Sequence, residues 1–217
     1  MPAYPYCALD VEHGGNDGYS ESVTTPILIL PGYADSDSAH WQSHWERADP
    51  GCRRVVQSDW LEPRLSDWLA TLDRYFRECE SPPVLVAHSL SCTLVAHWVE
   101  RRHGSAGAPR ALGGLGGHVG APHPVKAALL VAPADVESPD HTPEEVRNFA
   151  PIPQLLLPFP SIVVASDDDP FVTPERAAAF ARAWGSRLIT LPTAGHINAA
   201  AGYGPWPEGK KLLLDLW

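Results

Sequence analysis

Hydrophobic residues in this chain form short runs in which every position is apolar, separated by longer segments of mixed character. A run that is apolar at every position suits a β-strand buried on both faces, as in a parallel sheet. We therefore predict six strands. Four strong runs lie at 26–30, 84–87, 127–132 and 162–165, and two weaker ones lie at 54–56 and 188–191.

The segments between these runs carry apolar residues every three or four positions, which predicts amphipathic helices. The predicted helices span 65–76, 90–102, 174–184 and 207–216. Strands that alternate with helices favour right-handed βαβ units. The predicted fold class is therefore α/β, with about six mostly parallel strands and helices on both faces of the sheet.

Two segments interrupt this alternation. Residues 104–124 are rich in Gly, Ala and Pro, and we interpret them as a surface insertion. Residues 133–160 contain seven prolines and form a long connection after the fourth strand. Long loops of this kind are often functional. This one is too short and too rich in proline for a large helical lid, so we expect no lid domain and an open site.

Length and charge limit the possible functions. The 217 residues suit one domain, which we place at 26–217, with 1–25 as a poorly ordered lead-in. The net charge of −10 disfavours nucleic-acid binding. We see no secretory signal and no run of membrane-spanning length, so we expect no membrane association. The four cysteines are scattered without metal-ligand spacing, which favours free thiols in the cytoplasm.

The most informative segment is 84–92, where a predicted strand runs into Ser89 and a predicted helix begins immediately afterwards. In that setting a sharp turn exposes the serine hydroxyl and directs backbone N–H groups toward a developing oxyanion. The strand and the helix nearly touch, so the positions two before and two after the serine must be small. Ala87 and Ser91 occupy these positions in place of the glycines of the G-x-S-x-G pattern. Ser89 is therefore our candidate nucleophile.

A serine hydroxyl needs a base, and the base needs an acid that orients it. Enzymes of the α/β-hydrolase class supply them in the chain order Ser, Asp, His, each after a strand. Here an aspartate run at 167–169 follows the fifth predicted strand, and His196 follows the sixth. We favour Asp169 as the acid because Pro170 fixes the turn that points it inward. Asp167 and Asp168 are expected to be solvated, since closely packed like charges oppose joint burial.

Further assignments complete the candidate site. His88 is the alternative base, but its place inside the turn faces it away from Ser89, so we interpret it as structural. The oxyanion hole is expected to combine the N–H of Leu90 with that of Tyr33, in the loop after the first strand. No second ligand cluster accompanies the aspartate run, so we predict no metal site. Two tryptophans four residues apart, at 41 and 45, are interpreted as core residues rather than substrate contacts.

At these residues the chain resembles the small single-domain serine hydrolases typified by retinoblastoma-binding protein 9 and the bacterial YdeN-like proteins. The resemblance implies a compact α/β-hydrolase fold over 26–217, with Ser89, Asp169 and His196 as the triad and no metal or organic cofactor. Ser91 departs from it, because members usually carry glycine there. The matching segments are 30–33, 40–45, 57–60, 86–90, 168–171, 195–198 and, in the tail, 204–209.

Our leading hypothesis is a serine hydrolase that cleaves carboxylic esters through an acyl-Ser89 intermediate, with thioesters and small amides as further candidates. An open site suits small or short-chain acyl substrates, so the expected partner is a small molecule. The alternative is a protein-interaction module on the hydrolase scaffold, with little or no catalysis, since a fold does not guarantee a function. The sequence leaves the natural substrate and the oligomeric state open.

Overall fold

The apolar runs of the sequence become the strands of one six-stranded sheet in the computed structural model, which describes residues 25–103 and 124–216. The sheet order is β2-β1-β3-β4-β5-β6, and every neighbouring pair is parallel. The predicted lead-in at 1–25 and the predicted insertion at 104–124 lie outside the described residues, except for residues 25 and 124. The strands are β1 (Ile27–Leu30), β2 (Cys52–Arg54), β3 (Val84–His88), β4 (Ala127–Val131), β5 (Ser161–Ser166) and β6 (Arg187–Leu191).

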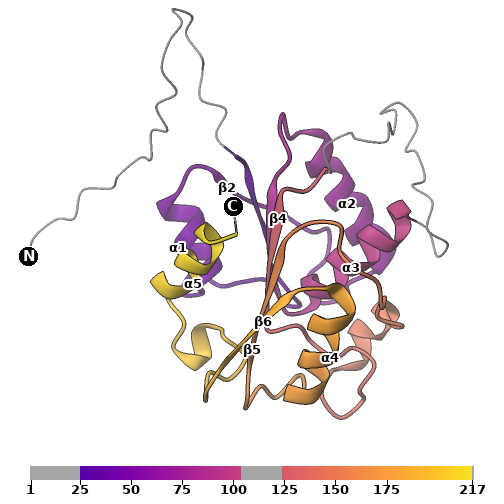
Figure 1. Cartoon of the computed structure of the whole chain (residues 1–217). Coiled ribbons are helices and arrows are strands. Elements are labelled where there is room, and N and C mark those ends of the chain that lie inside the picture. The colour runs from indigo at the N-terminus through magenta and orange to yellow at the C-terminus, as the bar shows by residue number, and fades with distance from the viewer. Residues whose placement is uncertain (1–24, 104–123, 217) are drawn as a thin grey trace, which may run out of the picture.

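Helices cover both faces of the sheet (Figure 1). One face carries α2, α3 and α4, and the other carries α1 and α5 (Figure 1). This arrangement confirms the predicted α/β fold class. The helices are α1 (Trp41–Ala48), α2 (Leu65–Arg77), α3 (Leu90–His103), α4 (Pro174–Trp184) and α5 (Pro207–Leu214), with 3-10 helices η1 (Glu144–Phe149) and η2 (Ala199–Ala201).

One predicted strand is misplaced. The run at 54–56 was expected to pair, whereas β2 covers Cys52–Arg54. The N–H of Val55 still donates to the carbonyl of Ile29 at 2.8 Å, but the chain then leaves the sheet. The N–H of Val56 donates to the Tyr75 hydroxyl at 3.1 Å, and its side chain is 52% exposed. The prediction was therefore wrong by two residues at this edge strand.

Large aromatic side chains fill both cores. Trp68, Trp98 and Trp184 are fully buried between the sheet and the α2, α3 and α4 layer. On the other face, the ring of Trp41 lies 4.7 Å from that of Trp45 and 5.2 Å from that of Trp206. Full burial of such a side chain is worth on the order of 1.5–3 kcal/mol. These layers hold the strand ends rigidly, and the predicted core role of the tryptophan pair is confirmed.

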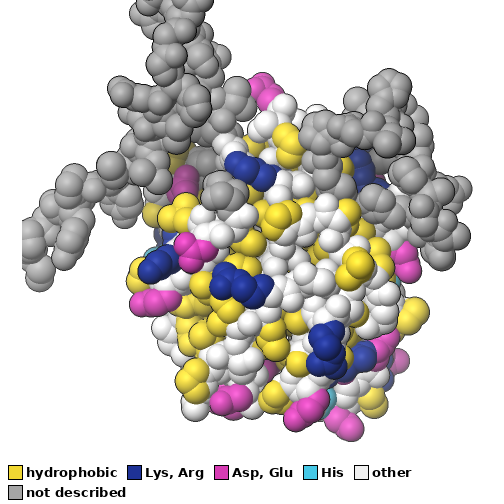
Figure 2. All heavy atoms as spheres, viewed as in Figure 1, with side chains coloured by type: hydrophobic (Ala, Val, Ile, Leu, Met, Phe, Trp, Pro, Cys, Tyr) yellow, Lys and Arg dark blue, Asp and Glu magenta, His cyan; other side chains and the backbone are white. Residues whose placement is uncertain are grey.

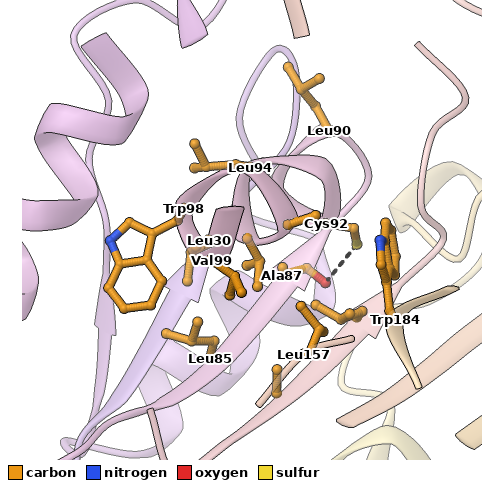
Figure 3. Packing of buried hydrophobic residues seen from close by; sticks show 14 of the residues in the cluster. Leu30, Leu85, Ala87, Leu90, Cys92, Leu94, Trp98, Val99, Leu157 and Trp184 are labelled. Carbon is orange, nitrogen blue, oxygen red and sulfur yellow. Dashed lines mark hydrogen bonds between the residues drawn. The ribbon is translucent and has the colours of Figure 1, made fainter. Parts of the chain in front are cut away.

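Helix α3 packs directly beneath the turn that carries Ser89. Its residues interleave with those of β1 and β3 (Figure 3). The thiol of Cys92 is fully buried there and donates to the carbonyls of Ala87 and Val131. Burial raises the pKa of this thiol strongly, so Cys92 is an inert packing residue.

The outer surface mixes charge types. On the face shown in Figure 2, acidic and basic side chains are scattered among hydrophobic ones. Among the described residues, no helix combines the length and the apolar character that a membrane crossing requires.

Candidate active site

The strand order places the candidate site. The chain goes from β1 outward to β2 and then returns to the other side of β1 with β3, so the order reverses between β1 and β3. Ligands of open α/β sheets bind beyond the carboxyl ends of the strands at such a reversal. Ser89 follows β3 and Tyr33 follows β1, so both lie at that position.

Ser89 occupies a strained turn between β3 and α3. Its φ is +56°, a conformation that costs a non-glycine residue on the order of 1–3 kcal/mol. The surrounding structure enforces it, because the Ser89 N–H donates to the Val131 carbonyl at 2.9 Å and α3 begins at the next residue. A Cβ atom on Gly32 would lie 2.7 Å from the Ser89 Cβ, so only glycine lets the loop after β1 pass this close.

Tyr33 follows Gly32 directly and lines the same pocket as Ser89. The next two N–H groups are engaged, that of Ala34 with the Trp60 carbonyl and that of Asp35 with the Gly32 carbonyl. The Tyr33 N–H has no acceptor among the described residues. Leu90 begins α3, so its N–H is a first-turn donor without a partner inside the helix. Both N–H groups therefore remain candidates for the predicted oxyanion hole.

Of the three aspartates, only Asp169 reaches the imidazole of His196. Its two carboxylate oxygens lie 3.0 and 2.9 Å from Nδ1 of His196, and both side chains are buried. A carboxylate only accepts, so Nδ1 carries the proton and Nε2 is left as the free base. The Phe171 N–H donates to Oδ1 of Asp169 at 2.9 Å, which fixes the carboxylate in the turn that follows β5.

The other two aspartates are exposed, as expected, but they are not free. Oδ1 of Asp167 accepts the Thr193 N–H at 2.7 Å, and Oδ1 of Asp168 accepts the Gly195 N–H at 2.7 Å. The hydroxyl of Ser166 also donates to Asp168 and, together with the Gly195 N–H, lowers the pKa of that carboxyl. Asp167 and Asp168 are thus solvated, as predicted, and in addition they hold the loop that carries His196, a role that the sequence did not indicate.

Two ring N–H groups hold the same loop from the other side. Nε2 of His88 lies 2.9 Å from the His196 carbonyl, so it must carry the proton and donate. Burial, reinforced by the nearby His196, lowers the pKa of His88 well below 6.5, so His88 stays neutral. The indole N–H of Trp41 donates to the Ile197 carbonyl at 2.8 Å. Our interpretation of Trp41 missed this contact, although a buried indole N–H usually requires an acceptor.

Ser89 and His196 line one pocket of about 380 Å³. Its lining contains both apolar and polar residues. The apolar lining comes from Ala134, Pro143, Val146 and Phe171, and the polar lining includes Asp35, Asp37, His40 and Asn198. Within the described ranges, no group of three His, Cys, Asp or Glu side chains is placed to hold a metal ion.

Part of the pocket lining comes from a segment that hydrogen bonds attach to the neighbouring helices. Val146 lies in η1, the 3-10 helix within 133–160. The Phe149 carbonyl lies 2.7 Å from Nε2 of His97 in α3. Asn148 donates to the Pro63 carbonyl at 2.9 Å and accepts the Leu65 N–H at 2.9 Å. These bonds tie η1 to α2 and α3, so the size of the pocket is set by the fold.

His40 makes folding sensitive to acid. Its ring is 4% exposed, and Nδ1 accepts the Gln42 N–H at 3.2 Å. The pKa of His40 is lowered from 6.5 to about 4, mainly by burial; Asp37 opposes this shift, and His196 and Arg54 contribute to it. Between about pH 6.5 and 4 the unfolded chain binds a proton that the folded chain does not. Stability must therefore fall as the pH drops through this window.

We expect His40 alone to remove about 3 kcal/mol from the free energy of unfolding between pH 7 and pH 4. Urea unfolding across this range measures the decline. The variant His40→Asn keeps a helix-capping acceptor but has no proton to gain, so its decline should be shallower. Parallel pH profiles for the wild type and the variant would contradict this account.

Comparison with known proteins gives an independent result. The model of the serine hydrolase family matches residues 27–215. The Bacillus subtilis protein YdeN, named as a hydrolase, is 34% identical over 87 residues, which make up 36% of this chain and 43% of YdeN. The alignment thus spans less than half of that curated relative. The crystal structure of YdeN is similar over 89% of this chain and 98% of its own, with a TM-score of 0.63 at 22% identity.

Two further crystal structures agree. A YdeN-like hydrolase from Pectobacterium atrosepticum is 32% identical, covers 88% of this chain and 90% of its own, and has a TM-score of 0.71. An α/β-hydrolase enzyme from a sediment metagenome of the Mar Chica lagoon has a TM-score of 0.58 at 15% identity, over 89% of this chain and 90% of that one. The last likeness is one of fold alone. Together these matches confirm the predicted α/β-hydrolase fold and the resemblance to the YdeN-like proteins.

Proposed function

Because this chain belongs to the serine hydrolase family, we propose that it cleaves carboxylic esters through an acyl-enzyme intermediate on Ser89. The observation that carries the proposal is the pairing of Asp169 with Nδ1 of His196, which leaves Nε2 as a base in the pocket that Ser89 lines. Type, order and strand-end position of the three residues agree with this chemistry.

The reaction proceeds in two half-reactions. Ser89 Oγ attacks the ester carbonyl as its proton passes to Nε2 of His196, and Asp169 stabilises the imidazolium. The negative charge on the carbonyl oxygen is received by the N–H groups of Tyr33 and Leu90. The proton of His196 then passes to the leaving alkoxide. Water repeats the sequence on the acyl-enzyme, which releases the carboxylic acid and restores the serine.

The pocket favours small acyl substrates without negative charge. Its volume of about 380 Å³ lies near the lower end of the range for small-molecule sites. Val146 and Phe171 provide an apolar surface for a short acyl chain. No Lys or Arg is among the described residues that line it, whereas Asp35 and Asp37 are. Neutral or cationic substrates are therefore favoured over anionic ones. Thioesters and small amides can react by the same acyl-enzyme chemistry.

The cellular setting is part of the same proposal. Three cysteines lie in the described ranges, and all three are free thiols. Free thiols suit a reducing compartment, so we propose that the protein acts in the cytoplasm on a small-molecule acyl substrate.

A series of p-nitrophenyl esters tests the proposed substrate class. We expect an initial burst of p-nitrophenol that marks the acyl-enzyme, and kcat/KM highest for acetate and butyrate. Between butyrate and laurate kcat/KM should fall by about tenfold or more, because a pocket of about 380 Å³, lined in part by η1, favours a short acyl chain over a long one. Faster hydrolysis of laurate would show that η1 moves or that the chain binds elsewhere, and it would overturn the short-chain assignment.

A further inference from the structure

Ser91 occupies a position where the G-x-S-x-G pattern has glycine, and it makes a contact that glycine could not. Its side chain is fully buried at the start of α3, two residues after Ser89. The hydroxyl donates to the carbonyl of Pro31 at 2.5 Å, across 60 positions of sequence. A short hydrogen bond with no access to water implies a fixed distance between α3 and the loop after β1.

That carbonyl lies at a critical point of the chain. The pairing of β1 with β3 ends at Leu30 opposite Ala87, so the Pro31 carbonyl has left the ladder. A buried carbonyl needs a donor, and the Ser91 hydroxyl supplies it. Two residues later comes Tyr33, whose N–H is one of the two proposed oxyanion donors. The position of this donor therefore depends on how the chain is held at Pro31.

The preceding carbonyl is held in a similar way. Nε2 of Gln42 donates to the Leu30 and Val86 carbonyls, both at 3.1 Å, and Ser36 donates to Oε1 of Gln42 at 2.7 Å. This network spans the ends of β1 and β3 but stops at Leu30. Ser91 extends it by one residue, to Pro31, which directly precedes the Gly32 that lies against Ser89.

We propose that Ser91 is a positioning residue that sets the Tyr33 N–H in the oxyanion hole, a role that rests on the proposed ester hydrolysis. An oxyanion donor is effective only within about 2.7–3.1 Å of the developing charge. A misplacement of about 1 Å can cost on the order of 100-fold in rate. A glycine at position 91 could not make this bond, so the proposed role depends on the hydroxyl.

The test compares Ser91→Ala with Thr93→Ala on an oxygen ester and its thionoester, in which sulfur replaces the carbonyl oxygen. Thr93 is a matched control, since it is fully buried on the same helix and its hydroxyl has no partner among the described residues. We expect Ser91→Ala to lower kcat on the oxygen ester by about tenfold, with KM changed less than about twofold. The thionoester should lose much less, because sulfur accepts hydrogen bonds weakly.

The ratio of the two rates distinguishes positioning from general damage. A fall in the oxygen-to-sulfur ratio in Ser91→Ala, but not in Thr93→Ala, supports the proposal. Equal losses on both esters, or equal effects of both substitutions, would overturn it. Ser91→Gly gives a second variant with the residue typical of the pattern, should the alanine variant fold poorly. Ser89→Ala in the same assay tests the proposed ester hydrolysis separately from the role of Ser91. If that variant turns over the oxygen ester at the wild-type rate, the proposed function itself is wrong.

Discussion

Ser89→Ala should lower turnover of p-nitrophenyl acetate by a factor on the order of 10⁶, down to the rate that binding and oxyanion donors alone sustain. The substitution removes the oxygen that forms the acyl bond in the proposed mechanism. It is also structurally mild, because the side chain is small and alanine tolerates the turn about as well as serine does. A fluorophosphonate probe should label the wild type at one serine and leave the variant unlabelled.

The control for this prediction is the folded state of the variant, measured by its thermal unfolding midpoint and circular dichroism. Labelling that persists in Ser89→Ala would assign the nucleophile elsewhere. Equal and slow hydrolysis by both proteins would instead favour the interaction-module hypothesis, in which the hydrolase scaffold is kept without its chemistry.

The fold could be predicted because strands buried on both faces appear in the sequence as continuous apolar runs. The prediction failed at a strand that contains charged residues. Strand β2 lies at the sheet edge and includes Arg54, whose charge is balanced by Asp35 at 2.5 Å and Glu46 at 2.8 Å. Because β2 carries arginines, the neighbouring apolar pair at 55–56 led us to place the strand two residues too late in the chain.

Helix α1 was missed for a related reason. Its buried face contains Gln42 and Ser43 beside its two tryptophans, so the apolar repeat that predicts a helix is incomplete. Both polar side chains are buried because they bond to the strand ends and to the loop after β1. Polar burial of this kind has no signature in hydrophobic spacing.

The candidate triad was accessible from the sequence because its members follow strands in a fixed order. The residues that hold them were not. Trp41 bonds to Ile197 across 156 positions, and Ser91 bonds to Pro31 across 60. In each case the acceptor is a backbone carbonyl, which every residue possesses, so neither partner can be found from residue type. Only the tertiary structure shows which carbonyl meets which donor.

Asp169→Asn should reduce turnover by about 10⁴-fold while leaving Ser89 and both oxyanion donors in place. The amide group of asparagine can donate to Nδ1 of His196, which favours the imidazole tautomer with its proton on Nε2. That tautomer cannot accept the serine proton. The neutral asparagine also provides no negative charge to stabilise the imidazolium. The loss therefore falls on kcat and leaves KM nearly unchanged. Steady-state kinetics on p-nitrophenyl butyrate measure both parameters.

The aspartate run supplies matched controls for this prediction. Asp168→Asn keeps an oxygen that can accept the Gly195 N–H, so its loss should stay within about tenfold. Asp168→Ala removes that acceptor from a loop that the Ser166 hydroxyl and Asp167 also hold, so it should cost more than the asparagine variant but far less than Asp169→Asn. If Asp168→Asn proved the crippling change and Asp169→Asn the mild one, the acid would be the neighbouring residue. The contact of Asp169 with His196 would then have to change when substrate binds.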